Sequence, residues 1–530
     1  MITLKGFVVV GIACLSVFTR LSAQTGEKPY SITLEEVTWT DWPGMHSFVK
    51  GEWDGRWILM TGRTGGLHGF LPPNPFPVTE ANNKIHMMDP VSGEHWSVFT
   101  NTLPDAMSDQ LRSTNAQYFQ RDKYLYIIGG YGKDTLSDIL ITFPNLLAVD
   151  LEQLSEAIIN ETEIVSSFRQ ITDTFFCVTG GEIEVLPNDE KIYLFGGHVF
   201  TGEYSKPASD AFTQTYTNEL RKFILEDDGI DIVVSDIEVI KDTANFHRRD
   251  LNFEPVVNPG EQFGLAAFAG VFQYEADWVW FNPVYINETG YAVDEKFKQK
   301  LNAYTCPVMP VYDSVSQNYY ATFFGGISQF YHNEVSDTIK EDLNVPFIND
   351  ISTIIKYADG STEQILEPIK FDALLGSNAV FILNEDVPHY SNKVIQLHKI
   401  YNQTLAGYIF GGIDALVPNF TPSSASNRLF KVWIDYENPL EIKNIVHDDI
   451  KLYPNPATEE VVITNNSTHQ IYSYQLLNNI GEIIIFEELN LFPNGLISID
   501  LKNLSAGIYY LKLSSKEEIL IKKIIKSNKF

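Results

Sequence analysis

The sequence predicts an all-β fold, and two observations carry this prediction. First, five short apolar runs, rich in aromatic and β-branched residues, each end in a pair of glycines. Second, helical periodicity is scarce in the 530 residues, whereas Gly and Pro punctuation is dense. We expect helices only at Glu152–Glu163 and Asp294–Tyr304. A repeated unit of strand and glycine pair is typical of sheets arranged around an axis, as in a β-propeller.

The glycine pairs set the expected number of sheets. They are Gly65-Gly66, Gly129-Gly130, Gly196-Gly197, Gly325-Gly326 and Gly411-Gly412. Glycine suits a strand end near an axis because it needs no side-chain space and allows unusual backbone angles. The step from Gly197 to Gly326 is about twice the earlier steps, so a sixth unit is expected at Gly264–Phe272, with Gly270 in the glycine position. We therefore expect about six blades, or seven if Ile32–Trp39 forms more than a closing strand.

The segment after the first pair supplies the rest of the unit. Lys84–Thr100 contains a strand, an Asp-Pro…Ser-Gly turn and a second strand that carries Trp96. This arrangement resembles the kelch-type propellers over roughly Trp53–Lys443, although a regular Tyr and Trp in every blade are lacking. The units exceed the ~50 residues of a kelch repeat, so the loops must be long. The resemblance implies a kelch-like β-propeller of about six blades at residues 53–446, with residues 24–52 as a lead-in and candidate closing strand.

The N-terminus predicts export. Residues 1–23 combine Lys5, an apolar stretch from Phe7 to Phe18, and small residues before Gln24. The stretch is too short to span a bilayer, so it is typical of a secretory signal peptide cleaved between Ala23 and Gln24. No later run reaches the ~18 apolar residues of a membrane span, and we expect no transmembrane segment.

The C-terminus, residues 447–530, forms a second recognisable piece. Tyr453-Pro454-Asn455-Pro456 predicts a rigid turn before a strand, Gly507 precedes an alternating strand, and lysines crowd the end. Several short strands predict a small C-terminal β-sandwich. The segment resembles the type A C-terminal sorting domains of the type IX secretion system found in Bacteroidota. That resemblance implies the type IX machinery as a partner, removal of the domain, and a product released or attached to the outer cell surface. An Ig-like accessory domain is the alternative.

Charge and cysteine content limit the function classes. The net charge is −30, and almost all of the acidity lies before residue 447. Such a surface repels nucleic acid and anionic membranes, so we expect neither as a partner. Only Cys177 and Cys306 follow the signal peptide, which excludes a disulfide-rich scaffold and leaves a disulfide between these two open.

Long connections point to the working face. Segments after the glycine pairs are long, whereas the other turns are tight, and binding residues concentrate on long loops over a rigid scaffold. The sharpest cluster is His247, Arg248, Arg249 and Asp250. The arginines could hold a carboxylate or sulfate, and His247 could act as a base oriented by Asp250. The alternative is structural, with the arginines pinning a long connection.

Further candidates follow the glycine pairs. His68, His198 and His332 are candidate ligand-binding residues, but no spacing typical of a metal site is present, so no metal ligand or cofactor is assigned and a divalent cation is left open. Aromatic residues share these loops: Phe70, Phe76, Phe200, Tyr204, Phe212, Tyr216, Phe330 and Tyr331. We expect a module that binds an extracellular glycan or protein. The alternatives are an extracellular polysaccharide lyase or glycosidase using His247 with Arg248 and Arg249, and a purely structural surface protein.

Overall fold

The computed structural model describes residues 28–69, 75–203, 212–419, 422–436, 450–466, 470–478, 481–515 and 519–528. The chain divides into two compact units, Met1–Tyr436 and Glu437–Phe530. Strands dominate both units, so the predicted all-β class is confirmed. The expected signal peptide and its cleavage site at Ala23 and Gln24 lie outside the described residues, as do Phe70 and Tyr204. None of the described helices has the length and apolar character needed to span a membrane.

Six sheets, each built on four antiparallel strands, follow one another along the first unit, and two of them are extended by further strands. The first three sheets contain β2 (Val49–Trp53), β3 (Arg56–Met60), β4 (Lys84–Met88) and β5 (His95–Phe99); β6 (Gln117–Arg121), β7 (Tyr124–Ile128), β10 (Asn145–Asp150) and β11 (Phe168–Thr172); β12 (Thr179–Val185), β13 (Ile192–Gly202), β15 (Glu219–Asp227) and β16 (Ile232–Lys241). The last three contain β17 (Asn252–Asn258), β18 (Gln262–Phe268), β19 (Val284–Asn287) and β20 (Gly290–Val293); β21 (Val308–Asp313), β22 (Asn318–Ile327), β25 (Phe347–Lys356) and β26 (Thr362–Lys370); β27 (Ala379–Leu383), β29 (Asn402–Gly411), β32 (Leu429–Tyr436) and β1 (Tyr30–Val37).

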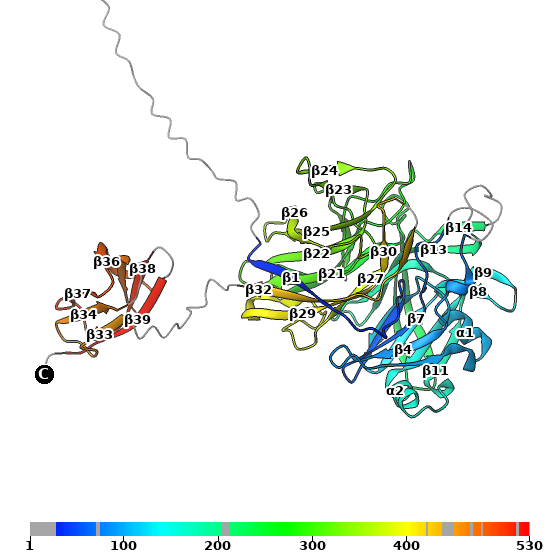
Figure 1. Cartoon of the computed structure of the whole chain (residues 1–530), viewed down its shortest axis with the longest axis horizontal. Helices are drawn as coiled ribbons and strands as arrows, with labels where there is room; N and C mark the ends of the chain where they lie inside the picture. Colours follow the sequence, from blue (N-terminus) through cyan, green and yellow to red (C-terminus); the bar gives the residue numbers. More distant parts are fainter. Residues whose placement is uncertain are drawn as a thin grey trace, which may run out of the picture. The chain divides into compact units, whose positions relative to one another are not determined.

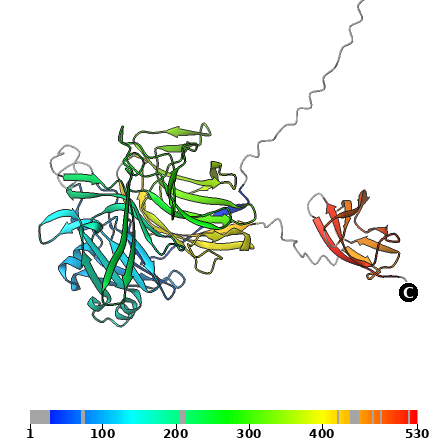
Figure 2. The same ribbon diagram turned by 180° about the vertical axis from the view of Figure 1, so that it is seen from behind.

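The fourth strand of the sixth sheet comes from the N-terminal end of the unit. β1 pairs with β32 in antiparallel register, from Tyr30 opposite Tyr436 to Val37 opposite Leu429. In both views the blue β1 lies against the yellow strands of this sheet (Figures 1 and 2). Ile32 of β1 is buried in the core between the fifth and sixth sheets. The segment expected as a closing strand therefore forms one strand of the last sheet.

Hydrophobic side chains fill the space between consecutive sheets. A separate cluster of buried residues lies between each pair of neighbours, and a sixth cluster joins the sixth sheet to the first. In that sixth cluster the ring of Trp57 on β3 lies 5.2 Å from Tyr408 and 6.3 Å from Phe410 on β29, measured between centroids. Large aromatic rings bury much apolar surface, so these contacts stabilise the approach of the last sheet to the first.

Six residues with left-handed backbone conformation lie at the start of the first strands. They have φ values of 41–65° and come one from each sheet: Ser47, Asn115, Gly180, Asp250, Thr305 and Asn378. We call them the axial residues. Backbone hydrogen bonds of 2.5–3.3 Å connect them, with N–H groups donating from Asn115 to Ser47, Gly180 to Asn115, Asp250 to Gly180, Asn378 to Thr305 and Ser47 to Asn378. Four of the six are Gly, Asn or Asp, the residue types that adopt this conformation most readily.

A second set of left-handed residues lies at or near the end of each second strand. These exit pairs are Thr61-Gly62, Gly129-Gly130, Gly196-Gly197, Ala269-Gly270, Gly325-Gly326 and Gly411-Gly412, and both members of each have positive φ. Gly270 therefore takes the glycine position expected in the fourth sheet. In five pairs the second glycine donates its N–H to a carbonyl just before the next first strand, as Gly412 does to Met45 at 2.9 Å. The exit pairs thus connect each sheet to its neighbour.

Gly65-Gly66 is not the exit pair of the first sheet, as the sequence had indicated. Strand β3 already ends at Met60, and neither glycine has a positive φ. Crowding requires these glycines instead, since a Cβ on Gly66 would lie 2.2 Å from the carbonyl oxygen of Ser423. Thr61-Gly62 is the equivalent pair. Because its first residue is threonine, the pattern of paired glycines did not predict it.

The connections between second and third strands are long and carry strands of their own. The strands within these connections are β8 (Tyr131–Asp134), β9 (Ile139–Thr142), β14 (Phe212–Tyr216), β23 (Phe330–Asn333), β24 (Thr338–Glu341), β30 (Ile413–Ala415) and β31 (Ser423–Ala425). A further short strand, β28 (Ile395–Gln396), pairs with β21. Because strand direction alternates within each meander, these connections lie at the same end of the sheets as the axial residues. We call this end the long-loop face.

One of the two expected helices is present. Helix α2 (Leu151–Ile159) overlaps the first expected range but begins one residue earlier, and α1 (Asp105–Leu111) was not expected. The expected helix at Asp294–Tyr304 is wrong, because the Asp294 carboxylate accepts the N–H groups of Lys296 and Phe297, both at 3.1 Å, and this turn replaces helical hydrogen bonds. The described 3₁₀ segments are Val78–Glu80, Thr100–Thr102, Val165–Ser167, Thr174–Phe176 and Leu397–Lys399.

The second unit consists of two sheets around one core. One sheet contains β33 (Ile450–Tyr453), β34 (Glu460–Asn465) and β37 (Gly495–Asp500); the other contains β36 (Ile483–Leu491), β35 (Ile471–Leu477), β38 (Gly507–Ser515) and β39 (Ile519–Lys526). Ile463 of the first sheet and Leu511 of the second belong to the same buried cluster, as in a β-sandwich. The Asn455 side chain donates to the Lys523 carbonyl at 2.7 Å and accepts the Ile525 N–H at 2.8 Å, so the proline-rich turn is attached to β39.

Candidate functional site

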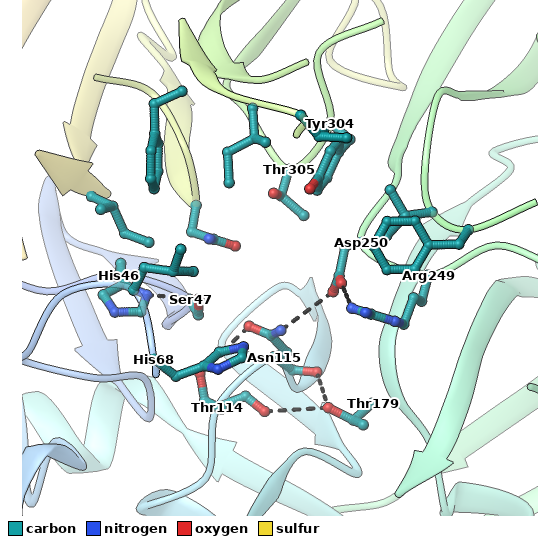
Figure 3. A pocket seen from close by; sticks show the side chains of 18 of the residues that line it. His46, Ser47, His68, Thr114, Asn115, Thr179, Arg249, Asp250, Tyr304 and Thr305 are labelled. Atoms are coloured by element: carbon teal, nitrogen blue, oxygen red, sulfur yellow. Dashed lines mark hydrogen bonds and ion pairs between the residues drawn. The ribbon is translucent and has the colours of Figure 1, made fainter. Parts of the chain in front are cut away.

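A pocket of about 370 Å³ lies at the long-loop face, where the six sheets meet. Five axial residues line it, and Thr179 contributes from the remaining sheet. Figure 3 shows Asp250 and Arg249 on one side of the cavity, His46 and Ser47 on the other, and Asn115 between them. The volume is within the range of small-molecule sites.

The lining combines hydrogen-bonding groups with apolar walls. Its neutral polar side chains are Ser47, Thr114, Asn115, Thr179, Gln214, Thr305, Asn344, Asn378 and Asn419. Its aromatic and aliphatic side chains include Phe76, Tyr131, Phe200, Phe272, Tyr304, Ile327, Phe347 and Ile413. Hydroxyl and amide groups both donate and accept hydrogen bonds, so the lining matches a ligand that does the same.

Arg249 and Asp250 form an ion pair at the edge of the cavity. The Asp250 carboxylate also faces the Asn115 amide, whose nitrogen lies 3.4 Å away, and the Arg249 Nε donates to the Tyr216 hydroxyl at 3.2 Å. Burial by itself lowers the pKa of Arg249, but Asp250 and Tyr216 outweigh it and the net pKa is raised. Arg249 therefore stays charged, and its charge is already balanced by Asp250.

Arg63 forms a second ion pair in the pocket wall. Its guanidinium donates to Glu80 at 2.9 Å and to the Pro77 carbonyl at 3.1 Å. The Phe76 ring covers it, with 3.9 Å from the guanidinium carbon to the ring centroid, and only 3% of the side chain is exposed. Arg63 thus contributes to the pocket wall, and its positive charge is balanced by Glu80.

Three histidines line the pocket, and all three are neutral at ordinary pH. Burial, with a smaller contribution from Arg63, lowers the pKa of His46 to about 3. Burial also lowers the pKa of His68, and it lowers that of His198 further, with Arg249 adding to the shift. His198 Nδ1 accepts from the Gln214 amide at 2.8 Å, which leaves its Nε2 as the donor. His68 Nδ1 faces the Gly69 carbonyl at 2.8 Å and is a donor.

The structure separates the cluster that the sequence had placed together. Arg248 is fully buried, and its guanidinium donates to the carbonyls of Asn245, Ala269 and Asn282 at 2.8–3.1 Å. His247 lies outside the lining, stacked between Tyr216 and Tyr274 with both ring centroids 3.8 Å away.

The expected pairing of base and orienting carboxylate is not formed. His247 Nδ1 lies 2.9 Å from Asn218, and Asp250 is occupied by Arg249 and Asn115. His332 is also outside the lining, on β23, with its Nε2 2.9 Å from Asp337. Of the candidate residues, Arg249, Asp250, His68 and His198 share the pocket.

Sequence reasoning missed His46, Arg63 and most of the axial residues. His46 and Ser47 immediately precede β2 and follow no glycine pair, so the search of the long loops passed over them. The available signal was residue type, because Asn, Asp and Gly just before a strand favour a left-handed start. Asn115, Gly180, Asp250 and Asn378 carry that signal.

A second cavity of about 260 Å³ lies below the axial residues and shares five of them with the pocket. The first strands line it, and they contribute Glu182 and Glu184 from β12 and Glu254 from β17. Burial raises the pKa of Glu182 and of Glu184 to about 8 each, with neighbouring carboxylates adding to the shift for Glu182. Burial also raises the pKa of Glu254 well above its ordinary value.

The described part of the chain contains neither a cluster of metal ligands nor a disulfide. No group of three or more His, Cys, Asp or Glu side chains there is arranged to hold a metal ion. Cys177 and Cys306 are both free thiols, and Cys306 is buried.

Comparison with known proteins identifies the second unit. The family described as "Secretion system C-terminal sorting domain" matches residues 451–527, which include Tyr453-Pro454-Asn455-Pro456 and Gly507. The protein is therefore a secreted or cell-surface protein that carries a type IX secretion sorting domain. The type IX machinery is its implied partner.

Two solved structures resemble the chain distantly. No curated protein matches the sequence at a significant level. A solved structure described as "Novel fungal alcohol oxidase with catalytic diversity among the AA5 family, in complex with copper" is 8% identical, has a TM-score of 0.37, and the match covers 94% of this chain and 99% of that one. "Structure of YjhT" is 11% identical with a TM-score of 0.39, covering 72% and 94%. Likeness at this level carries no argument about function.

Proposed function

We propose that the protein is an extracellular binding module whose first unit is a kelch-like propeller of six blades, with a glycan ligand held in the pocket of the long-loop face. Support for the propeller comes from the six four-stranded meanders, the hydrogen bonds among axial residues, and the core cluster between the sixth and first sheets. The sorting unit directs export and is then removed, and the first unit acts outside the cell.

One observation carries the binding role. The pocket brings together neutral donors and acceptors from five of the six sheets, interleaved with aromatic side chains. A sugar presents the complementary pattern, because its hydroxyl groups donate and accept while its C–H faces pack on aromatic rings. A pocket of about 370 Å³ suits a terminal or single sugar residue better than an extended protein surface.

Calorimetric titration of the mature secreted chain with a panel of mono- and oligosaccharides tests this function. Tyr304 lines the pocket, and Tyr304→Phe removes only a hydroxyl. We expect this variant to weaken the best ligand by about five- to tenfold, the equivalent of one hydrogen bond.

The matched control is Tyr291→Phe, which removes the hydroxyl of an exposed tyrosine that bonds Asp242 outside the pocket. Equal weakening in both variants, or no binding by the wild type, would contradict the proposal. Release of reducing ends during the titration would replace the binding role with a catalytic one.

A further inference from the structure

The two cationic side chains that line the pocket are each balanced by a carboxylate. Arg249 is balanced by Asp250, and Arg63 is balanced by Glu80 and covered by Phe76. Among the described lining residues no other side chain is cationic, because burial keeps the three histidines neutral. An acidic ligand would therefore enter without a free positive partner, and burying an unpaired charge is costly.

Negative charge also lies close to the site. Asp277 is an exposed carboxylate on the rim of the pocket. A second carboxylate, Asp250, faces the cavity beside Arg249. The enclosing chain is itself strongly acidic, with a net charge of −30. The potential that these groups create repels an anion in a low-dielectric cavity much more than in water.

Asp250 and Asn115 supply a geometry suited to hydroxyl groups. A carboxylate oxygen of Asp250 lies 3.4 Å from the Asn115 amide nitrogen, a long contact that an inserted ligand hydroxyl can replace by donating to Asp250 and accepting from Asn115. The ion pair with Arg249 holds the carboxylate in place. Figure 3 shows Asp250 beside Arg249 on one side of the cavity, with Asn115 next to them and Tyr304 and Thr305 above.

We infer that the pocket selects an uncharged sugar and rejects the acidic counterpart, with Asp250 and Asn115 holding its hydroxyl groups. This inference rests on the proposed glycan-binding function and names the class of its ligand. It replaces the earlier expectation of an anion held by two arginines, because Arg248 donates to backbone carbonyls and Arg249 forms an ion pair with Asp250.

Matched pairs of ligands test the inference on the mature secreted chain. Methyl glucoside is compared with methyl glucuronide, and methyl galactoside with methyl galacturonide, by calorimetry at low salt. In the pair that binds, the neutral glycoside should bind at least about tenfold more tightly than its uronide. Added salt should reduce this difference in affinity. Tighter binding of the uronide overturns the inference while leaving the glycan-binding function intact. Absence of binding by all four, together with a silent wider panel, overturns both.

Two variants test the stated cause. Asp250→Asn keeps a residue type that tolerates the left-handed conformation and frees Arg249, so the preference for the neutral sugar should shrink by about tenfold. Asp277→Asn removes an exposed carboxylate from the rim of the pocket, and should raise uronide affinity about threefold. An unchanged preference in both variants would refute the electrostatic explanation.

Discussion

Gly129 is restricted by two separate constraints at once. Its φ of 64° is unfavourable for a side chain, and a Cβ would lie 1.9 Å from the Val178 carbonyl oxygen. We expect Gly129→Ala to lower the free energy of unfolding by more than about 3 kcal/mol, because the backbone of the neighbouring sheet must move. Urea unfolding followed by tryptophan fluorescence measures the change.

Gly260 provides the matched control. It has a φ of 75°, yet a Cβ there would meet nothing within 4 Å. Gly260→Ala isolates the conformational cost, about 1–2 kcal/mol. If the two substitutions cost the same, close approach between sheets does not explain the exit-pair glycines.

Glu182 makes a pH-dependent prediction. Its pKa is about 8 in the folded chain and near 4.5 when exposed, so the folded state holds a proton that the unfolded state releases. Stability must therefore fall as pH rises from 4.5 through 8. Glu182→Gln should raise the melting temperature above pH 8 and leave it unchanged near pH 4.5. A melting temperature that is equally affected at both pH values would contradict the buried-acid explanation.

Single residues also show where sequence reasoning reached its limit. Gly270 could be predicted because the step between glycine pairs was doubled, whereas Thr61 could not, since nothing in its type indicates a positive φ. His68 and His198 could be predicted from their loops. The sequence could not show that His247 lies outside the pocket while Arg249 lines it, because the stacking of His247 on Tyr216 and Tyr274 depends on tertiary contacts.

At the scale of the element, β1 is the strand whose role is easiest to test. Ile32 is 3% exposed and packs between the fifth and sixth sheets. Ile32→Asp would bury a carboxylate in that core, so we expect a loss of about 3 kcal/mol or more in the free energy of unfolding. Thermal and urea unfolding of the secreted chain measure it.

Thr33 is the neighbouring position on the exposed side of the same strand. Thr33→Asp should change stability by less than about 1 kcal/mol. A large loss from Thr33→Asp, or a small one from Ile32→Asp, would mean that β1 does not contribute to the core as its register with β32 indicates.

The elements themselves were largely predictable, since glycine pairs and tight turns mark strand ends. The helix expected at Asp294–Tyr304 was wrong because the Asp294 carboxylate accepts the backbone N–H groups that a helix would use. The spacing of apolar residues does not reveal this competition, so the sequence pattern still resembled a helix. The first sheet begins at Val49, ahead of the expected start at Trp53, because β2 lacks a preceding glycine signal.

At the scale of the whole molecule, acid sensitivity follows from buried histidines. His46 in the pocket wall and His86 on β4 both have their pKa lowered by burial to about 3. The unfolded chain takes up these protons near pH 6.5 and the folded chain does not, so stability is lost as pH falls from 6.5 towards 3. His46→Gln should therefore reduce the loss of stability between pH 6.5 and 3 relative to the wild type, as followed by fluorescence-detected unfolding. An unchanged loss would exclude His46 as a contributor.

The pairing of β1 with β32 also has a temporal consequence. Arg428 and Glu36, which form an ion pair across this sheet edge, are 392 positions apart in the chain. Such a contact forms late, because loop closure over that length precedes any stabilisation. Five sheets can assemble from local hairpins as the polypeptide emerges, but the sixth must wait for residues near 436. The first strand of this unit to be synthesised is thus the last to find its partner, and the nascent unit stays open until its final strand is made.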